Sequence, residues 1–493
     1  MGIDVEKEDF SSEEYEAYSQ RLYECLQALK TLLASPSFGD MPLQIGGELE
    51  NYIVDDQGIV RALNTELIEK SGDSKYTTEL NRFNLEINYQ PNMLNAHAFS
   101  RLHQEMLTSH QKLQGLADNY NAHIIPTGIL PTLRRQHLTP KYMTNSVRYR
   151  ALSKHLLKMR GEKFVVDIAG EDNISLTSEN VALEGANTSF QYHLMVKPDE
   201  FSQVFNATQL ATSLLVAISA NSPMLLGKIL WDETRIALFK QSIDSRARNN
   251  LDWKQPARVA FGQGWNRKGP WEIFASSVSL YPPIFAVNTD EDPIASVTNK
   301  TVPKLHELAL HMGTTWPWNR PVYCPQGNGH IRIEMRALPA GPSFIDMIAN
   351  AAFATGIVMG LRDSIDDIVA MMPFRFADFN FYRAAQHGLD ASIIWPHAKK
   401  HQLIEMPITE VISAMIPIAE KGLTRLGIDQ KEIEQNLNII EQRLIHKVTG
   451  ARWQKQYIHN IEAHSNRDQA CHEMFQRYVE NFHSGAPVHE WGQ

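Results

Sequence analysis

The sequence contains very little cysteine, with only Cys25, Cys324 and Cys471 among 493 residues. These three lie far apart, their number is odd, and none has the CxxC spacing typical of zinc sites and redox motifs. A disulfide framework of the kind found in small secreted domains is therefore not expected. We interpret the three cysteines as free thiols in a reducing compartment.

Long apolar runs and an excess of basic charge are also missing. A membrane-spanning helix needs about 18 or more apolar residues, and the longest candidate run, 210–220, is interrupted by threonine and serine and is interpreted as a buried helix. The formal net charge of -9 argues against a nucleic-acid or membrane partner, because either would need a dominant basic field. The acidic first nine residues lack the apolar core of a signal peptide, so a cytoplasmic location is expected.

The most informative stretch is 330–336, in which ionisable and apolar side chains alternate. Successive side chains of a β-strand point to opposite faces, so this run predicts a strand with one apolar and one charged face. The charged face would carry His330, Arg332, Glu334 and Arg336. A solvated edge strand gives the same pattern, so this run alone does not distinguish a site from an ordinary surface.

Three further stretches, 43–52, 80–88 and 188–195, also predict strands with one polar face. Their polar faces would carry Glu48 and Glu50, then Asn84, Glu86 and Asn88, then Ser189, Gln191 and His193. Carboxylate oxygens suit hard divalent cations, and arginine forks suit phosphate oxygens. Four such strands together predict a platform for a nucleotide phosphate and its metal.

The order of predicted elements indicates an α+β protein. Helices are predicted at 11–35, where Ser11 to Glu14 form a plausible cap, and at 97–120. A long apolar helix is predicted at 344–361, and the chain beyond it is expected to be mainly helical. Because strands precede helices, alternating βαβ units are not expected. The basic segment 131–150 fits either a solvated linker or a loop that closes on an anionic substrate.

A series of short motifs in consistent order resembles the glutamate–cysteine ligase-like carboxylate–amine ligases. They are GGELE (46–50), ELNRFNLEIN (79–88), NTSFQYHL (187–194), SANSPMLLG (219–227), TTWPWNRP (314–321), HIRIEMRALPAGP (330–342) and NFYRAAQHGLDA (380–391). The resemblance implies a curved, mostly antiparallel sheet of the glutamine synthetase type, flanked by helices and followed by a helical C-terminal region. It also implies three parts: an N-terminal packing helix (1–39), a catalytic domain (40–395) and a helical extension (396–493).

The resemblance also implies roles for individual residues. Metal ligands would be Glu48, Glu50, Glu86, His193 and Glu334, with Glu79 close by. Arg332 and Arg336 would neutralise charge on the transferred phosphoryl group, and the substrate-binding residues would be Arg235, Arg320, Gln191 and Asn221. Two alternatives stay open: a buried histidine is often a satisfied core residue, and Arg235 and Arg320 could form ordinary surface ion pairs.

The expected activity is amide formation with ATP and magnesium, or manganese, through an acyl phosphate. The family default is the γ-carboxylate of glutamate joined to cysteine or another amine. A guanidino kinase and a non-catalytic protein that binds a nucleotide or an amino acid are the alternatives on the same fold. The partners would be small molecules, and the chain is compatible with a homo-oligomer.

Overall fold

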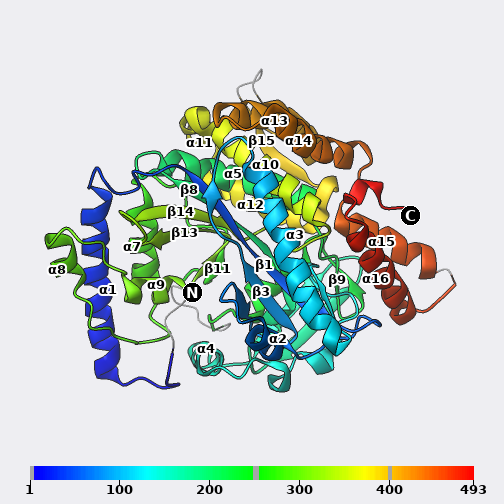
Figure 1. Ribbon diagram of the computed structural model, residues 1–493, viewed down its shortest axis with the longest axis horizontal. Helices are drawn as coiled ribbons and strands as arrows, with labels where there is room; N and C mark the ends of the chain where they lie inside the picture. Colours follow the sequence, from blue (N-terminus) through cyan, green and yellow to red (C-terminus); the bar gives the residue numbers. More distant parts are fainter. Residues whose placement is uncertain (1–4, 248–254, 398–401, 463, 493) are drawn as a thin grey trace.

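The computed structural model describes residues 5–247, 255–397, 402–462 and 464–492. Residues 1–4 of the acidic N-terminal stretch lie outside these ranges. The largest sheet occupies the centre of the molecule, and helices surround it (Figure 1).

An antiparallel sheet curls into half a barrel at this centre, in the order β13-β14-β8-β1-β3-β2, with β4 and β5 also paired to β1. Its strands are β1 (Gln44–Val54), β2 (Tyr76–Thr78), β3 (Asn84–Asn88), β4 (Asn92–Met93), β5 (His123–Ile125), β8 (Phe190–Val196), β13 (Asn319–Cys324) and β14 (His330–Met335). The four strands with a predicted polar face are direct neighbours in it. The predicted α+β fold with a curved antiparallel sheet is confirmed.

One face of the sheet is apolar and is covered by helices. Leu49, Phe190 and Ile333 are fully buried on it, and the Tyr192 hydroxyl lies 2.7 Å from Oγ1 of Thr355 in α10. Helix α10 (Phe344–Leu361) packs in turn against α3 (Ala98–Ala117), α5 (Phe201–Ser219), α13 (Ile408–Arg425) and α14 (Gln430–Ile445). The apolar half of each alternating strand therefore builds the core, which leaves the polar half on the opposite face.

Two segments, α5 and Phe344–Met371, are long and apolar enough to cross a membrane by length and composition alone. In each of them, 89% of the most apolar window is buried inside the protein, and α5 packs against α10. Core helices pass the same test, and the predicted buried helix around 210–220 is found as α5.

The first helix, α1 (Ser12–Leu33), begins at the predicted cap. Oγ of Ser11 accepts a hydrogen bond from the backbone N–H of Glu14, and the Glu14 carboxylate accepts one from the backbone N–H of Ser11. Helix α1 packs against α7 (Pro270–Leu280), α8 (Pro293–Thr298) and α9 (His306–Met312).

The other helices are α2 (Asn64–Ser71), α4 (Val147–Arg160), α6 (Thr234–Ser242), α11 (Ile365–Met371), α12 (Phe374–His387), α15 (Gly450–Glu462) and α16 (Arg467–Ser484).

The region after α10 is less uniformly helical than the sequence predicted. A hairpin, β15 (Ser392–His397) and β16 (Gln402–Pro407), separates α12 from α13. Its first strand is rich in β-branched and aromatic residues, and proline at 396 and 407 disfavours a continuous helix. A second hairpin, β6 (Phe164–Ala169) and β7 (Asn173–Ser178), precedes β8, and short strand pairs join β9 (Met224–Leu225) to β10 (Lys228–Ile229) and β11 (Val259–Ala260) to β12 (Trp316–Pro317).

The basic segment 131–150 is folded against the rest of the chain. Arg134 pairs with Asp468 of α16 at 3.0 Å, and Arg150 pairs with Glu8 at 2.6 Å. The ordered contacts argue against a solvated linker.

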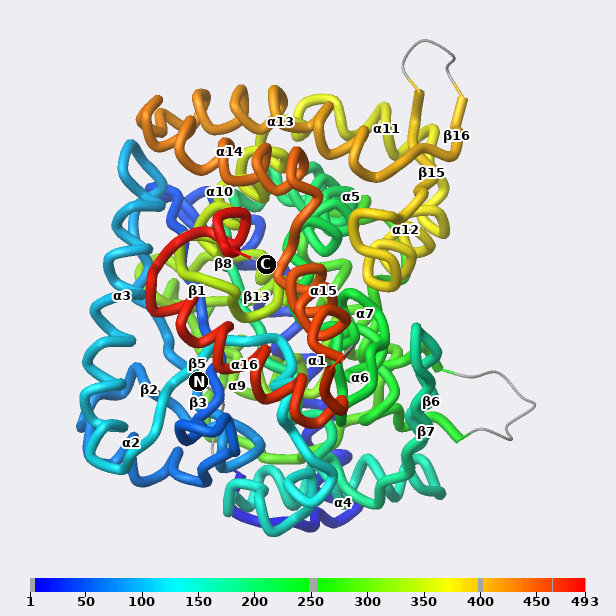
Figure 2. Tube along the Cα trace, turned by 90° about the vertical axis from the view of Figure 1, so that its right-hand side faces the viewer, coloured from blue at the N-terminus to red at the C-terminus, as the bar shows by residue number. Residues whose placement is uncertain are grey.

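A buried ion pair ties the C-terminal helices to the core. Arg443 of α14 and Asp346 of α10 lie 2.6 Å apart, with side chains 1% and 0% exposed. The second oxygen of Asp346 accepts hydrogen bonds from Oγ of Ser343 and from the backbone N–H of Val488. Figure 2 shows α13 and α14 next to α10, so this part of the chain belongs to the same helical layer.

Candidate active site on the polar face of the sheet

The strand register places charged residues of neighbouring strands opposite one another. Glu50 of β1 lies opposite Glu86 of β3, and Glu334 of β14 lies opposite both His193 of β8 and Arg320 of β13. Opposed residues in antiparallel strands point to the same face. The strands therefore present their polar side chains on one common surface, as the alternation in the sequence predicted.

A first group of potential metal ligands consists of Glu48, His193 and Glu334, whose ligand atoms all lie within 4.8 Å of one another. Nε2 of His193 lies 3.4 Å from an oxygen of Glu48 and 3.4 Å from an oxygen of Glu334. This nitrogen is buried and has no well-aligned hydrogen-bond partner among the described residues. A histidine satisfied within a core would have such a partner, so the geometry favours a ligand role over the core alternative.

A second group consists of Glu50, Glu79 and Glu86, again with ligand atoms within 4.8 Å of one another. Glu86 accepts hydrogen bonds from Oγ1 of Thr77 at 3.0 Å and from Nδ2 of Asn88 at 2.8 Å. Glu79 stands before the turn that leads into β3, and this turn carries its side chain to the group. Glu48 and Glu50, which are neighbours on one strand face, thus belong to different groups.

The electrostatics of the second group favour neutralisation of its charges by a proton or a cation. Burial raises the pKa of Glu50 and Glu86, and it raises the pKa of Glu79 well above its usual range, with further increases from Glu86 and Glu50. Burial and then the charge of Glu86 also raise the pKa of Glu48 in the first group. Carboxylates this close are stable only when a proton or a cation neutralises them.

Glu334 differs from the other carboxylates because two arginines surround it. Arg320 donates from Nε and Nη2 to the two oxygens of Glu334, at 2.7 and 3.0 Å, and Nη1 of Arg336 donates at 3.2 Å. Although burial raises the pKa of Glu334, Arg320 and Arg336 hold it well below the usual range. Glu334 is therefore ionised at neutral pH. Arg320 forms its ion pair with this buried carboxylate, and not with a residue at the protein surface.

The two arginines predicted to act on the phosphoryl group both lie at this face. The Nε atoms of Arg332 and Arg336 are both buried. Neither atom has a hydrogen-bond partner within the part of the chain that the structure describes. Nη1 of Arg336 donates to Oε1 of Gln191, and Nε2 of Gln191 donates to Glu50 at 2.8 Å. Gln191, predicted to bind substrate, thus links Arg336 to the second group.

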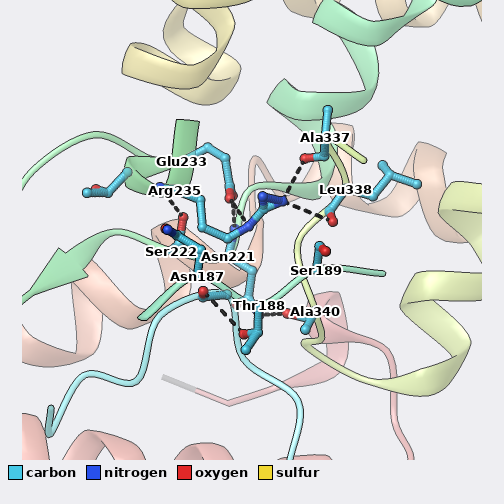
Figure 3. A network of polar contacts seen from close by, with 12 residues as sticks. Asn187, Thr188, Ser189, Asn221, Ser222, Glu233, Arg235, Ala337, Leu338 and Ala340 are labelled. Carbon is cyan, nitrogen blue, oxygen red and sulfur yellow. Dashed lines mark hydrogen bonds and ion pairs between the residues drawn. The ribbon is translucent and has the colours of Figure 1, made fainter. Parts of the chain in front are cut away.

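Arg235 of α6 is buried behind the site, where it holds the backbone that follows β14 (Figure 3). Its Nη2 donates to the carbonyl oxygens of Arg336, Ala337 and Leu338, at 3.3, 3.2 and 3.1 Å. Its Nε lies 3.2 Å from Glu233. The ion pair is thus buried, and these bonds position the segment that carries Arg336.

Asn221, which was predicted to bind substrate, has its side chain engaged within the protein. It is fully buried, and its Nδ2 donates to the carbonyl oxygen of Ala340 at 2.8 Å and to the Tyr478 hydroxyl at 2.9 Å. Its Oδ1 accepts from Nε2 of Gln454 at 2.9 Å. Both amide atoms are engaged within the protein, so the contacts of Asn221 are those of a structural residue joining α15 and α16 to the chain after β14.

The sequence motifs implied a curved antiparallel sheet with carboxylates and arginines on one face, as in carboxylate–amine ligases. The structure has this architecture, an antiparallel sheet that forms half a barrel. The chain belongs to glutamate–cysteine ligase family 2 (GCS2), whose model matches residues 44–480. The predicted family is thus confirmed, and the protein is an ATP-dependent carboxylate–amine ligase. The match extends well into the C-terminal helices.

A solved structure shows the same fold. The glutamate–cysteine ligase of Francisella tularensis, in complex with AMP, has a TM-score of 0.50 and 13% sequence identity, over 91% of this chain and 90% of that chain. A bifunctional glutathione synthetase from Pasteurella multocida has a TM-score of 0.44 and 12% identity, over 95% of this chain and 54% of that chain. A comparison with curated protein sequences finds no match.

Proposed function

We propose that the protein uses ATP to phosphorylate the γ-carboxylate of glutamate and that an amine, such as that of cysteine, then displaces phosphate from the acyl phosphate. The observation that carries this proposal is the presence of two separate carboxylate-rich groups on the sheet face that also holds Arg332 and Arg336. Two anions, the carboxylate and the polyphosphate, must come together in this reaction. The guanidiniums of Arg332 and Arg336 carry positive charge that offsets their repulsion, and cations held by the two groups would add to it.

Both groups are suited to magnesium or manganese. The first offers two carboxylates and an unpaired buried imidazole nitrogen, and the second offers three carboxylates. Oxygen ligands with an occasional histidine suit these hard cations. When bound by these residues, such ions would offset the negative charge of the phosphates.

The chain's own residues would orient the phosphates and the attacked carboxylate. Arg332 and Arg336 each have an unpaired, buried Nε, so each can donate to a phosphate oxygen. Glu334 keeps Arg336 in place through the bond from Nη1, and Gln191 keeps it next to Glu50. Arg235 fixes the backbone at Arg336 from behind.

A panel of carboxylate amino acids and amines, each with ATP and MgCl₂, tests this function through release of ADP and phosphate. We expect glutamate to support ADP release and a second amine substrate to yield an amide detectable by mass spectrometry. ADP release without any amide product, and with phosphate on a guanidino compound, would identify a kinase instead. Tight ATP binding without turnover of any pair would contradict the ligase proposal.

Glu48→Gln tests the first ligand group through stability. Burial and Glu86 raise the pKa of Glu48, so removing its charge should leave the melting temperature of the metal-free protein unchanged or higher. The further rise caused by MgCl₂ with ATP should shrink, because binding to the folded state stabilises in proportion to affinity. Thermal melts with and without these ligands provide the measurement.

Glu66→Gln is the matched control, since Glu66 lies on α2 and pairs only loosely with Arg82 at 3.5 Å. It should keep the full ligand-induced rise. If Glu48→Gln also kept it, Glu48 would not be a metal ligand. Glu50→Gln is a less clean test, because Glu50 accepts hydrogen bonds from the backbone N–H and hydroxyl of Ser189 that an amide group would disturb.

A further inference from the structure

A small pocket adjoins the second ligand group. It is lined by two carboxylates, Glu50 and Glu184, two guanidiniums, Arg235 and Arg336, and two aromatic side chains, Phe239 and Trp318. Its volume is about 20 Å³, which is room for one group the size of a water molecule. A single polar head group therefore fits there, beside the charged side chains that line the pocket.

The charged groups of this pocket differ in the hydrogen bonds and ion pairs that they form with other residues. Glu50 accepts hydrogen bonds from Ser189 and Gln191, Arg235 binds backbone carbonyls, and Arg336 binds Gln191 and Glu334. The Glu184 carboxylate is half-buried and has no hydrogen bond or ion pair among the described residues. Of the two carboxylates that line the pocket, Glu184 is therefore the one whose oxygens accept no hydrogen bond from a described residue.

The surroundings of Glu184 make this unpaired state costly. Glu184 shares its small pocket with a second carboxylate, Glu50, and Arg336 of the same pocket is bound to Gln191 and Glu334. A half-buried carboxylate without a partner is unfavourable unless a donor or a positive charge reaches it. Glu184 belongs to neither ligand group, and one carboxylate alone offers too few ligands for a divalent ion.

We propose that Glu184 binds the α-ammonium group of the amino acid whose carboxylate is phosphorylated. This inference rests on the proposed ligase function. An ammonium group has three donors, matches a water molecule in size, and carries the charge that complements Glu184. The neighbouring Arg336 and Glu50 place the other end of the same molecule at the phosphoryl-transfer surface. Glu184 would thus distinguish amino acids from simple carboxylic acids.

The test compares glutamate with glutarate, which has the same two carboxylates but no ammonium group. KM is measured for each by ADP release, with saturating ATP and MgCl₂ and fixed cysteine, in the wild type, Glu184→Gln and Glu179→Gln. Glu179 is the matched control because it lies near Glu184 in the chain, is exposed, and pairs with Lys163 at 2.8 Å. If the panel identifies another amino acid as substrate, that amino acid and its analogue without the amino group replace glutamate and glutarate.

We expect Glu184→Gln to raise KM for glutamate at least about 10-fold, the effect of losing one charge-assisted hydrogen bond. KM for glutarate and for ATP should change less than about 2-fold, and Glu179→Gln should behave as the wild type. If KM rose equally for glutamate and glutarate, or if neither KM changed, the assignment of Glu184 would be overturned while the ligase function stayed intact. Absence of ADP release with every amino acid in the wild type would overturn both.

Discussion

Glu334→Gln is expected to lower ADP release by about 10²- to 10³-fold, the size of effect seen when one preorganised electrostatic contact is removed from an active site. The substitution keeps the shape of the side chain but removes the charge that lies between Arg320, Arg336 and His193. An amide also cannot accept both arms of the Arg320 fork. Steady-state assays with ATP, MgCl₂ and the amino acid identified by the panel measure the loss.

The same variant should also be less stable, by about 3 to 5 kcal/mol, because breaking a buried pair leaves the partner charge uncompensated. The side chain of Glu334 is 2% exposed and that of Arg320 is 17% exposed. Urea unfolding of the metal-free protein measures this cost separately from activity. Glu480→Gln, an exposed carboxylate paired with Arg477 at 2.8 Å, should change neither quantity. Turnover at the wild-type rate in Glu334→Gln would rule out Glu334 as a metal ligand.

Arg336→Lys should lower kcat by about 10²-fold while changing KM for ATP by less than about 3-fold. Lysine keeps the positive charge but cannot reproduce the planar fork. Its three donors leave one nitrogen, so they cannot occupy both the Nη1 position, which binds Glu334 and Gln191, and the unpaired Nε position. The loss should fall on the transition state, where negative charge on the transferred group is most spread out.

Kinetic constants for ATP in Arg336→Lys and in Arg425→Lys provide the comparison. Arg425 forms an exposed ion pair with Asp363 at 2.9 Å, and its substitution should be neutral. If KM for ATP rose more than kcat fell, Arg336 would serve ground-state binding of the nucleotide.

The strands of the site could be predicted because each alternates between a buried and a polar face. Ile331, Ile333 and Met335 are buried as the alternation requires, and β14, β8 and β1 lie close to their expected bounds. The strand expected from residue 80 begins only at Asn84. The residues before it form a turn in which Asn81 pairs with Met143, a long-range contact with no local signature.

The roles of Asn221 and Arg235 could not be predicted for a related reason. Both carry side chains that suit a ligand, and only the packing of distant segments shows that Gln454, Tyr478 and the backbone after β14 occupy their hydrogen-bonding groups. Glu184 was missed because it lies in a short turn before β8 with no periodic pattern. Sequence alternation therefore identifies sheet faces, whereas residues supplied by turns require the tertiary structure.

The bonds of Asp346 have a consequence for the order in which the chain folds. This carboxylate lies in the core next to the helix that covers the sheet, yet its partners include Arg443 and the backbone of Val488. During synthesis, the strands and α10 leave the ribosome before Arg443 and Val488 have been made. Packing α10 at that stage would bury the charge of Asp346 without these partners, which is unfavourable. Contacts of such long sequence separation slow folding. A chain halted before residue 443 should therefore remain loosely packed around α10 and depend on chaperones until the remaining helices arrive.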